Sequence, residues 1–107
     1  MPVVTYLSPA GVARDIAVPT GISVMQAALD NKVNGILGEC GGNCMCATCH
    51  VYVHADFLSR IPPASKNENA MLEITAAERR PNSRLSCQIK IHEGLEGLVV
   101  QLPVKQR

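Results

Sequence analysis

Apolar residues along the chain are grouped into short segments that alternate with turn signals. Residues 3–7 and 15–18 are rich in apolar and β-branched side chains, and residues 8–11 between them read Ser-Pro-Ala-Gly, a turn signal. These segments predict an antiparallel hairpin at the beginning of the chain. Residues 51–53 and 98–102 predict two further short strands.

Three pairs of residues have the spacing of a capping box, in which two side chains satisfy backbone N–H groups at the start of a helix. They are Ser23 with Gln26, Ser65 with Glu68, and Thr75 with Glu78. The first pair predicts a helix through about Lys32, with Met25, Ala28 and Leu29 on the face that packs against a sheet. The second pair predicts a short helix through Leu72, and the third predicts one more short turn of helix.

Leu85, Ile89 and Ile91 predict strand on both sides of Cys87. Repeats, low-complexity segments and linkers are absent from the sequence, so residues 1–107 are expected to form one domain. The expected fold is a mixed sheet with one main helix and short additional helices, of class α+β.

Composition and charge exclude several classes of protein. Hydrophobic residues make up 47% of the chain, which excludes intrinsic disorder, and aromatic residues only 3%, which predicts an aliphatic core. The net charge of +1 leaves no basic stripe for nucleic acid, and no apolar run reaches the ~18 residues that span a membrane. Residues 1–6 read as a strand and lack the layout of a signal peptide, so we expect a cytoplasmic monomer.

The cysteines carry the strongest chemical signal. The chain has five, an odd number, and four of them lie within residues 40–49. In a reducing compartment this pattern favours metal binding over disulfides. Cys46 and Cys49 form a C-x2-C pair, Cys40 lies upstream, and Cys87 follows after 37 intervening residues. The resulting C-x5-C-x2-C spacing with a distant fourth cysteine is close to the plant-type 2Fe–2S pattern of C-x4-C-x2-C and a distant cysteine.

The spacing alone leaves the first ligand open, because Cys44 could replace Cys40. Gly41 and Gly42 favour Cys40, since glycines after a ligand allow the positive φ angles that turn N–H groups toward an anionic sulfur. Thr48, between two candidate ligands, is a further candidate donor to sulfur.

Other metal and redox sites fit the sequence less well. A zinc ribbon has two C-x2-C pairs and this chain has one, so a structural zinc module stays an alternative. A thioredoxin-like site places its C-x-x-C at the start of a helix, whereas a strand is expected to follow Cys49. A Rieske site needs two histidines paired with cysteines, and His50 and His54 lack a second such pair. His50 is expected to fix the loop by a hydrogen bond, and His54 and His92 to lie on the surface.

Four segments together resemble one known family. They are residues 39–53 (ECGGNCMCATCHVYV), 81–89 (PNSRLSCQI), 23–28 and 71–73. The chain resembles the vertebrate/bacterial-type 2Fe–2S ferredoxins, the group of adrenodoxin and putidaredoxin, and the C-x5-C-x2-C spacing is this family's own. The resemblance implies a β-grasp fold and one 2Fe–2S cluster held by Cys40, Cys46, Cys49 and Cys87, with no matching role for Cys44.

The resemblance also implies a function as a one-electron carrier and not an enzyme. Electrons would pass from NAD(P)H through a flavin-dependent ferredoxin reductase to this protein and then to a cytochrome P-450 monooxygenase. An alternative within the family is a ferredoxin that supplies electrons for iron–sulfur cluster assembly.

Partner docking is expected to depend on a local patch of charge. An oxidised cluster adds about −2, so the loaded protein carries about −1 and global charge steers partners weakly. In the family, partners are recognised near the short helix that here carries Glu68, Met71 and Glu73. Together with Glu39 beside the cysteine loop, these residues are the expected docking patch, with the carboxylates meeting Arg or Lys of the partners.

Overall fold

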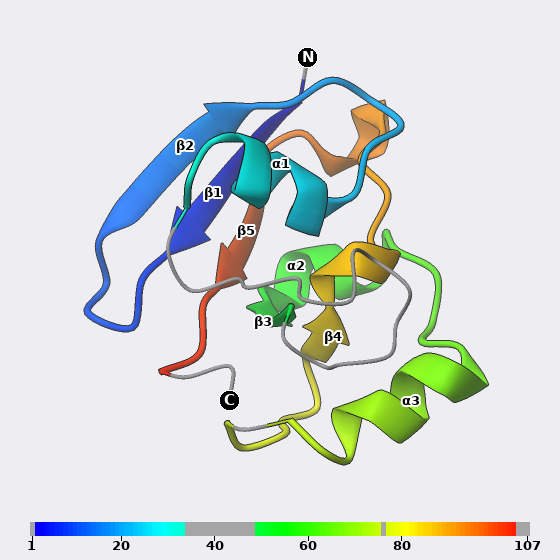
Figure 1. Cartoon of the computed structure of the whole chain (residues 1–107). Helices are drawn as coiled ribbons and strands as arrows, with labels where there is room; N and C mark the ends of the chain where they lie inside the picture. Colours follow the sequence, from blue (N-terminus) through cyan, green and yellow to red (C-terminus); the bar gives the residue numbers. More distant parts are fainter. Residues whose placement is uncertain (1, 34–48, 76, 105–107) are drawn as a thin grey trace.

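The computed structural model describes residues 2–33, 49–75 and 77–104. Its described residues form one mixed sheet of five strands in the order β2-β1-β5-β3-β4 (Figure 1). The strands are β1 (Val3–Leu7), β2 (Ala13–Ala17), β3 (His50–Val53), β4 (Ser83–Leu85) and β5 (Leu98–Gln101). The helices are α1 (Val24–Asp30), α2 (Ala55–Leu58) and α3 (Lys66–Leu72), with 3-10 turns η1 (Ser86–Gln88) and η2 (Glu93–Leu95).

The predicted hairpin at the beginning of the chain is confirmed. β1 and β2 are antiparallel, with Val3 opposite Ala17, and Gly11 closes the turn at a φ of +86° by donating its N–H to Ser8. β2 begins two residues earlier than expected, because β1 continues to pair with Arg14 and Ala13.

α1 begins where the capping box places it. The Oγ of Ser23 accepts the N–H of Gln26 at 3.0 Å, whereas the side chain of Gln26 donates to Asp30 and does not return to Ser23. The helix ends before Lys32, whose φ of +56° lies in the left-handed region. The expected apolar face is correct for Met25 and Ala28, but Leu29 is exposed.

The sheet joins the two ends of the chain. β5 pairs in parallel with β1 and antiparallel with β3, and β3 pairs antiparallel with β4. α1 crosses one face of this sheet in front of β1 and β5, and α3 lies beyond β4, on the side of the molecule away from β2 (Figure 1). The core between these layers is mainly aliphatic, as the composition predicts.

Two predictions about secondary structure are wrong. The described residues 77–81 contain no helix, because the Thr75 hydroxyl donates to the carbonyls of Leu72 and Ala77 and does not cap an N-terminus. Ile89 and Ile91 are buried as their alternation indicates, but they lie outside the strands. Their backbones bond instead to the segment that leads into α1.

The helix start that the second capping box predicts is confirmed, although only the serine of the box caps the helix. The Oγ of Ser65 accepts the N–H of Glu68 at 3.1 Å, and α3 runs from there to Leu72. α2 was not expected from the sequence; His54, which is half-exposed, caps it by accepting the N–H of Asp56. In the described part of the chain, no helix has both the length and the apolar character needed to cross a membrane.

Candidate metal centre

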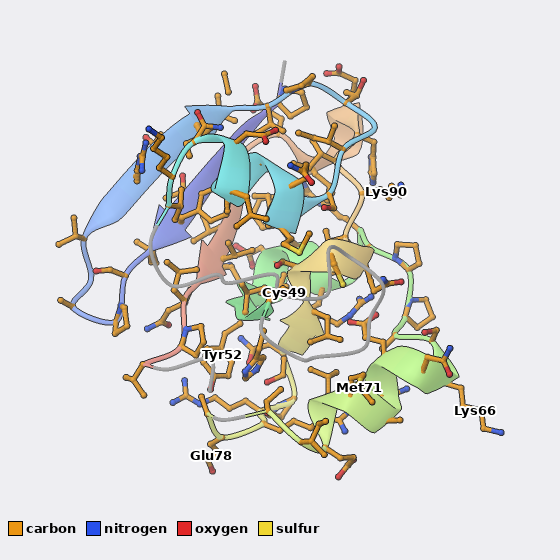
Figure 2. The ribbon with its side chains drawn as sticks, viewed as in Figure 1. Cys49, Tyr52, Lys66, Met71, Glu78 and Lys90 are labelled. Atoms are coloured by element: carbon orange, nitrogen blue, oxygen red, sulfur yellow. The ribbon has the colours of Figure 1, made fainter. Side chains whose placement is uncertain are left out.

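The pairing of β3 with β4 brings Cys49 and Cys87 together. Cys49 immediately precedes β3, Cys87 follows β4 by two residues, and the two strands are antiparallel with His50 opposite Leu85. Ser86 completes the connection, since its N–H and its Oγ–H both donate to the carbonyl of Cys49, at 2.9 and 2.7 Å. Figure 2 shows Cys49 close to the ends of these two strands.

The environment of the two thiols suits a thiolate-bound metal centre. Cys49 and Cys87 are 1% and 7% exposed. A hydrogen bond to Cys87 and then burial raise the pKa of Cys49, so this thiol stays neutral in the absence of a cation. Metal cations reverse this preference, and a buried pair of soft sulfur ligands from distant segments fits an iron–sulfur cluster. Cys40, Cys44, Cys46, Thr48 and Glu39 lie outside the described residues.

His50 fixes the strand next to Cys49. Its ring is fully buried, lies with Nε2 2.9 Å from the Oγ of Ser83 on β4, and meets the ring of Tyr52 edge to face. Burial, followed by the nearby charges of Arg80 and Arg79, lowers the pKa of His50 to about 4, so the ring is neutral at neutral pH. The expected hydrogen bond of His50 is therefore made to Ser83 on the neighbouring strand.

Glu68 does not lie on the surface, contrary to the expectation that it docks partners. It is 1% exposed, and its carboxylate accepts Nε and Nη2 of Arg84 at 2.6 and 2.9 Å. The same carboxylate accepts the N–H of Leu85 at 2.9 Å, while Nη1 of Arg84 donates to Pro62 at 2.7 Å. Glu68 therefore joins α3 to β4, two residues before Cys87, and is withdrawn from the docking patch.

Arg84 is not recognisable from the sequence alone as the partner of this carboxylate. A charged side chain in a β-rich segment just before a cysteine could have indicated a buried partner, but its identity depends on the packing of α3. The same is true of Ser83 and Ser86, whose hydroxyls were not singled out.

The other two docking candidates of α3 are more accessible. Glu73 is the C-cap residue of the helix, with a side chain that is 71% exposed and paired to Arg79 at 2.6 Å. Met71 is partly buried against the core, and Figure 2 shows it on α3. Glu73 is thus the described carboxylate of the patch that solvent can reach.

A sheet of this order with two buried cysteines at the ends of neighbouring strands fits the class of 2Fe–2S ferredoxins. Residues 7–92 match the family described as the 2Fe–2S iron–sulfur cluster binding domain, and the chain belongs to this family. Among curated relatives, rhodocoxin of Rhodococcus erythropolis is 47% identical over 99% of each chain. Putidaredoxin of Pseudomonas putida is 48% identical over 96% of each chain.

Solved structures agree with this relationship. A crystal structure of a reduced putidaredoxin variant from Pseudomonas putida matches with a TM-score of 0.97 and 47% identity, covering 98% of this chain and 99% of the other. Putidaredoxin in the covalent putidaredoxin reductase–putidaredoxin complex matches with a TM-score of 0.92 and 48% identity, covering 94% and 97%.

The family relationship tests the expected fold, role and cofactor of this protein. The β-grasp ferredoxin fold is confirmed, and the protein is an electron carrier with one 2Fe–2S cluster and is not an enzyme. The alternative of a structural zinc module is therefore wrong.

Proposed function

We propose that this ferredoxin carries single electrons from an NAD(P)H-dependent flavin ferredoxin reductase to a cytochrome P-450 monooxygenase. The observation that carries the proposal is the pair of buried thiols, Cys49 and Cys87, in a fold that matches putidaredoxin nearly end to end. A reductase partner is supported by the solved complex of putidaredoxin with putidaredoxin reductase. The P-450 partner is supported by the family resemblance of the cysteine loop.

We further propose that Cys40, Cys46, Cys49 and Cys87 hold the cluster, which supplies a one-electron site when bound. The β3–β4 pairing supports this assignment for Cys49 and Cys87, because Ser86 bonds to the carbonyl of Cys49 with both its N–H and its hydroxyl. The His50 ring, next to Cys49 in the chain, is fully buried. These residues position sulfur ligands and contact no substrate.

A cysteine exchange tests the ligand assignment. Cys40→Ser is expected to lose or severely weaken the cluster, whereas Cys44→Ser retains it, because only the former sulfur is assigned as a ligand. Visible absorbance and the electron paramagnetic resonance signal of the reduced protein measure cluster content. Retention in Cys40→Ser together with loss in Cys44→Ser would overturn the assignment.

For docking, we propose a patch formed by Glu39, Met71 and Glu73. Glu73 is exposed and held by Arg79 at 2.6 Å, so a partner's Arg or Lys can replace that cation at little cost. The net charge of +1 makes such a local contact more important than overall attraction.

Charge reversal at Glu73 tests the patch. Glu73→Lys is expected to raise the KM for this ferredoxin in the reductase or P-450 reaction by about three- to tenfold, because a rim charge acts mainly on association. Glu93→Lys is the matched control, since Glu93 is also exposed but lies on η2, across the molecule from α3 (Figure 1). Equal KM values for the two variants in both reactions would contradict the docking proposal.

A measurement of electron transfer to candidate acceptors tests the carrier role. Reduced protein, prepared with a flavin reductase and NADH or NADPH, is mixed anaerobically with candidate P-450 enzymes, and the rate of haem reduction is measured. We expect reduction by at least one candidate at a rate that supports turnover. Reduction of none of them, with efficient electron supply to a cluster-assembly scaffold, would overturn the P-450 role in favour of cluster assembly.

A further inference from the structure

The residue that follows Cys87 donates a hydrogen bond to its sulfur. Nε2 of Gln88 lies 3.4 Å from Sγ of Cys87, which is within the range of an N–H···S hydrogen bond. Gln88 is the last residue of η1 and is partly buried. Gln88 is thus a donor to sulfur in addition to Thr48, the candidate that the sequence indicates.

The backbone around Gln88 is fixed on both sides. Before it, Ser86 is bound to the carbonyl of Cys49 through its N–H and its hydroxyl. After it, Ile89 is fully buried, and its carbonyl accepts the N–H of Val24 at the start of α1 at 2.9 Å. The Gln88 side chain therefore starts from a backbone that cannot move away from Cys87 without breaking contacts to β3 and α1.

We propose that Gln88 is a positioning residue that raises the reduction potential of the cluster through its hydrogen bond to Cys87. This inference rests on the proposed ligation by Cys87. An N–H donor withdraws electron density from a ligand sulfur and stabilises the more negative, reduced state of the centre. The donor belongs to the protein's fixed structure, so it favours reduction in the same way in every encounter with a partner.

Water can replace only part of this effect. Gln88 lines a cavity of about 420 Å³ together with Arg60, Ile61 and Lys90, so a water molecule can enter the space that a smaller or apolar side chain leaves. Such a water is held less rigidly than the side-chain amide of Gln88, which is covalently attached to a fixed backbone. We therefore expect a moderate change in potential and not a collapse of the site.

The test is Gln88→Met, which keeps the length of the side chain and removes the donor. At a fixed applied potential, the ratio of reduced to oxidised protein is expected to fall about threefold, which is about 30 mV at 59 mV per tenfold for one electron. The matched control is Gln26→Met. Gln26 lines a second cavity with Cys87, but its amide donates to Asp30 at 2.8 Å. Its potential is expected to stay at the wild-type value.

A spectroscopic measurement separates the hydrogen bond from a general structural effect. Resonance Raman bands of the iron–thiolate stretches are expected to shift in Gln88→Met and to stay unchanged in Gln26→Met. Gln88→Glu, which keeps the shape and replaces the donor with an acceptor, is expected to lower the potential at least as much as Gln88→Met.

The outcomes distinguish this inference from the ligand proposal. Cluster loss in Cys87→Ser supports ligation by Cys87, whereas a fully stable cluster there overturns it. A cluster-loaded Gln88→Met with a wild-type potential, or equal shifts in Gln88→Met and Gln26→Met, overturns the role of Gln88 alone. Failure of both Gln88 variants to load a cluster also overturns it, because the side chain is then needed for assembly and not for tuning.

Discussion

The two sides of the sheet, meaning the two ends of its strand order, are stabilised by different kinds of contact. One side has β3, β4 and α3 and presents Cys49 and Cys87; the other, the remote side, has β1, β2 and α1. Around β1, β2 and α1, the buried side chains are mainly aliphatic. Packing holds the hairpin to the helix, together with the hydroxyl of Tyr6, which donates to the carbonyl of Val24 at 2.7 Å. Around β3, β4 and α3 lie all the polar and charged residues that are buried in the described part of the chain. They are His50, Glu68, Ser83, Arg84 and Ser86.

This difference follows the location of the candidate metal centre. Apolar packing tolerates small displacements, because dispersion and the hydrophobic effect depend weakly on direction. Hydrogen bonds and bidentate ion pairs fix distances and angles, at the risk of a large penalty when one partner is lost. The side that presents Cys49 and Cys87 buries polar and charged side chains in directional contacts, whereas the remote side buries mainly aliphatic side chains.

The largest effect is expected from breaking the buried ion pair. Arg84→Met leaves the carboxylate of Glu68 buried without its cation, which costs about 3–5 kcal/mol in the free energy of unfolding. The measurement is the urea midpoint of the cluster-loaded protein, followed by circular dichroism and by visible absorbance. Cluster content is expected to fall with it, because the two bonds from Arg84 to Glu68, which help to join α3 to β4 near Cys87, are lost.

A double variant checks that the penalty comes from the unpaired charge. Glu68→Met combined with Arg84→Met removes both charges and is expected to recover much of the stability lost in Arg84→Met. If the single variant is as stable as the double variant, the ion pair does not distinguish the two sides of the sheet.

A smaller effect is expected from a cavity on the remote side. Ile16 on β2 is 7% exposed, and Ile16→Ala should cost about 2–3 kcal/mol, with Ile16→Val costing about 1 kcal/mol. At temperatures where both variants are folded, the visible spectrum is expected to match that of the wild type. A changed spectrum in Ile16→Val would show that the packing of the hairpin also controls the metal centre.

The smallest effect compares one hydroxyl on each side of the sheet. Ser83→Ala removes the buried partner of His50 and the acceptor for Arg80 N–H, which should cost about 1–2 kcal/mol. Thr5→Val removes a hydroxyl that donates to Asp15 across β1 and β2 in an exposed position, and should cost about 0.5 kcal/mol or less. Urea midpoints of the two variants measure the difference, and equal costs would contradict the comparison.

Local features of the sequence predicted much of the fold. Ser23 and Ser65 mark helix starts because a capping hydroxyl acts on N–H groups only three residues away. The hairpin follows from apolar strands and a glycine turn within the first 17 residues. The same local information failed at Thr75, whose hydroxyl bonds to carbonyls of near neighbours and caps no helix, and at Ile89, where a contact with a distant segment replaced the expected strand.

The sequence by itself determined the chemistry of this protein, since the cysteine spacing and its flanking residues indicate a 2Fe–2S ferredoxin. The tertiary structure decided which polar groups serve that chemistry. Glu68 has the sequence signature of a surface carboxylate on a short helix, yet β4 places Arg84 against it and buries both. Helix caps and ligand spacing act between near neighbours in the chain, whereas such pairings depend on strand register and helix packing between residues that lie far apart in it.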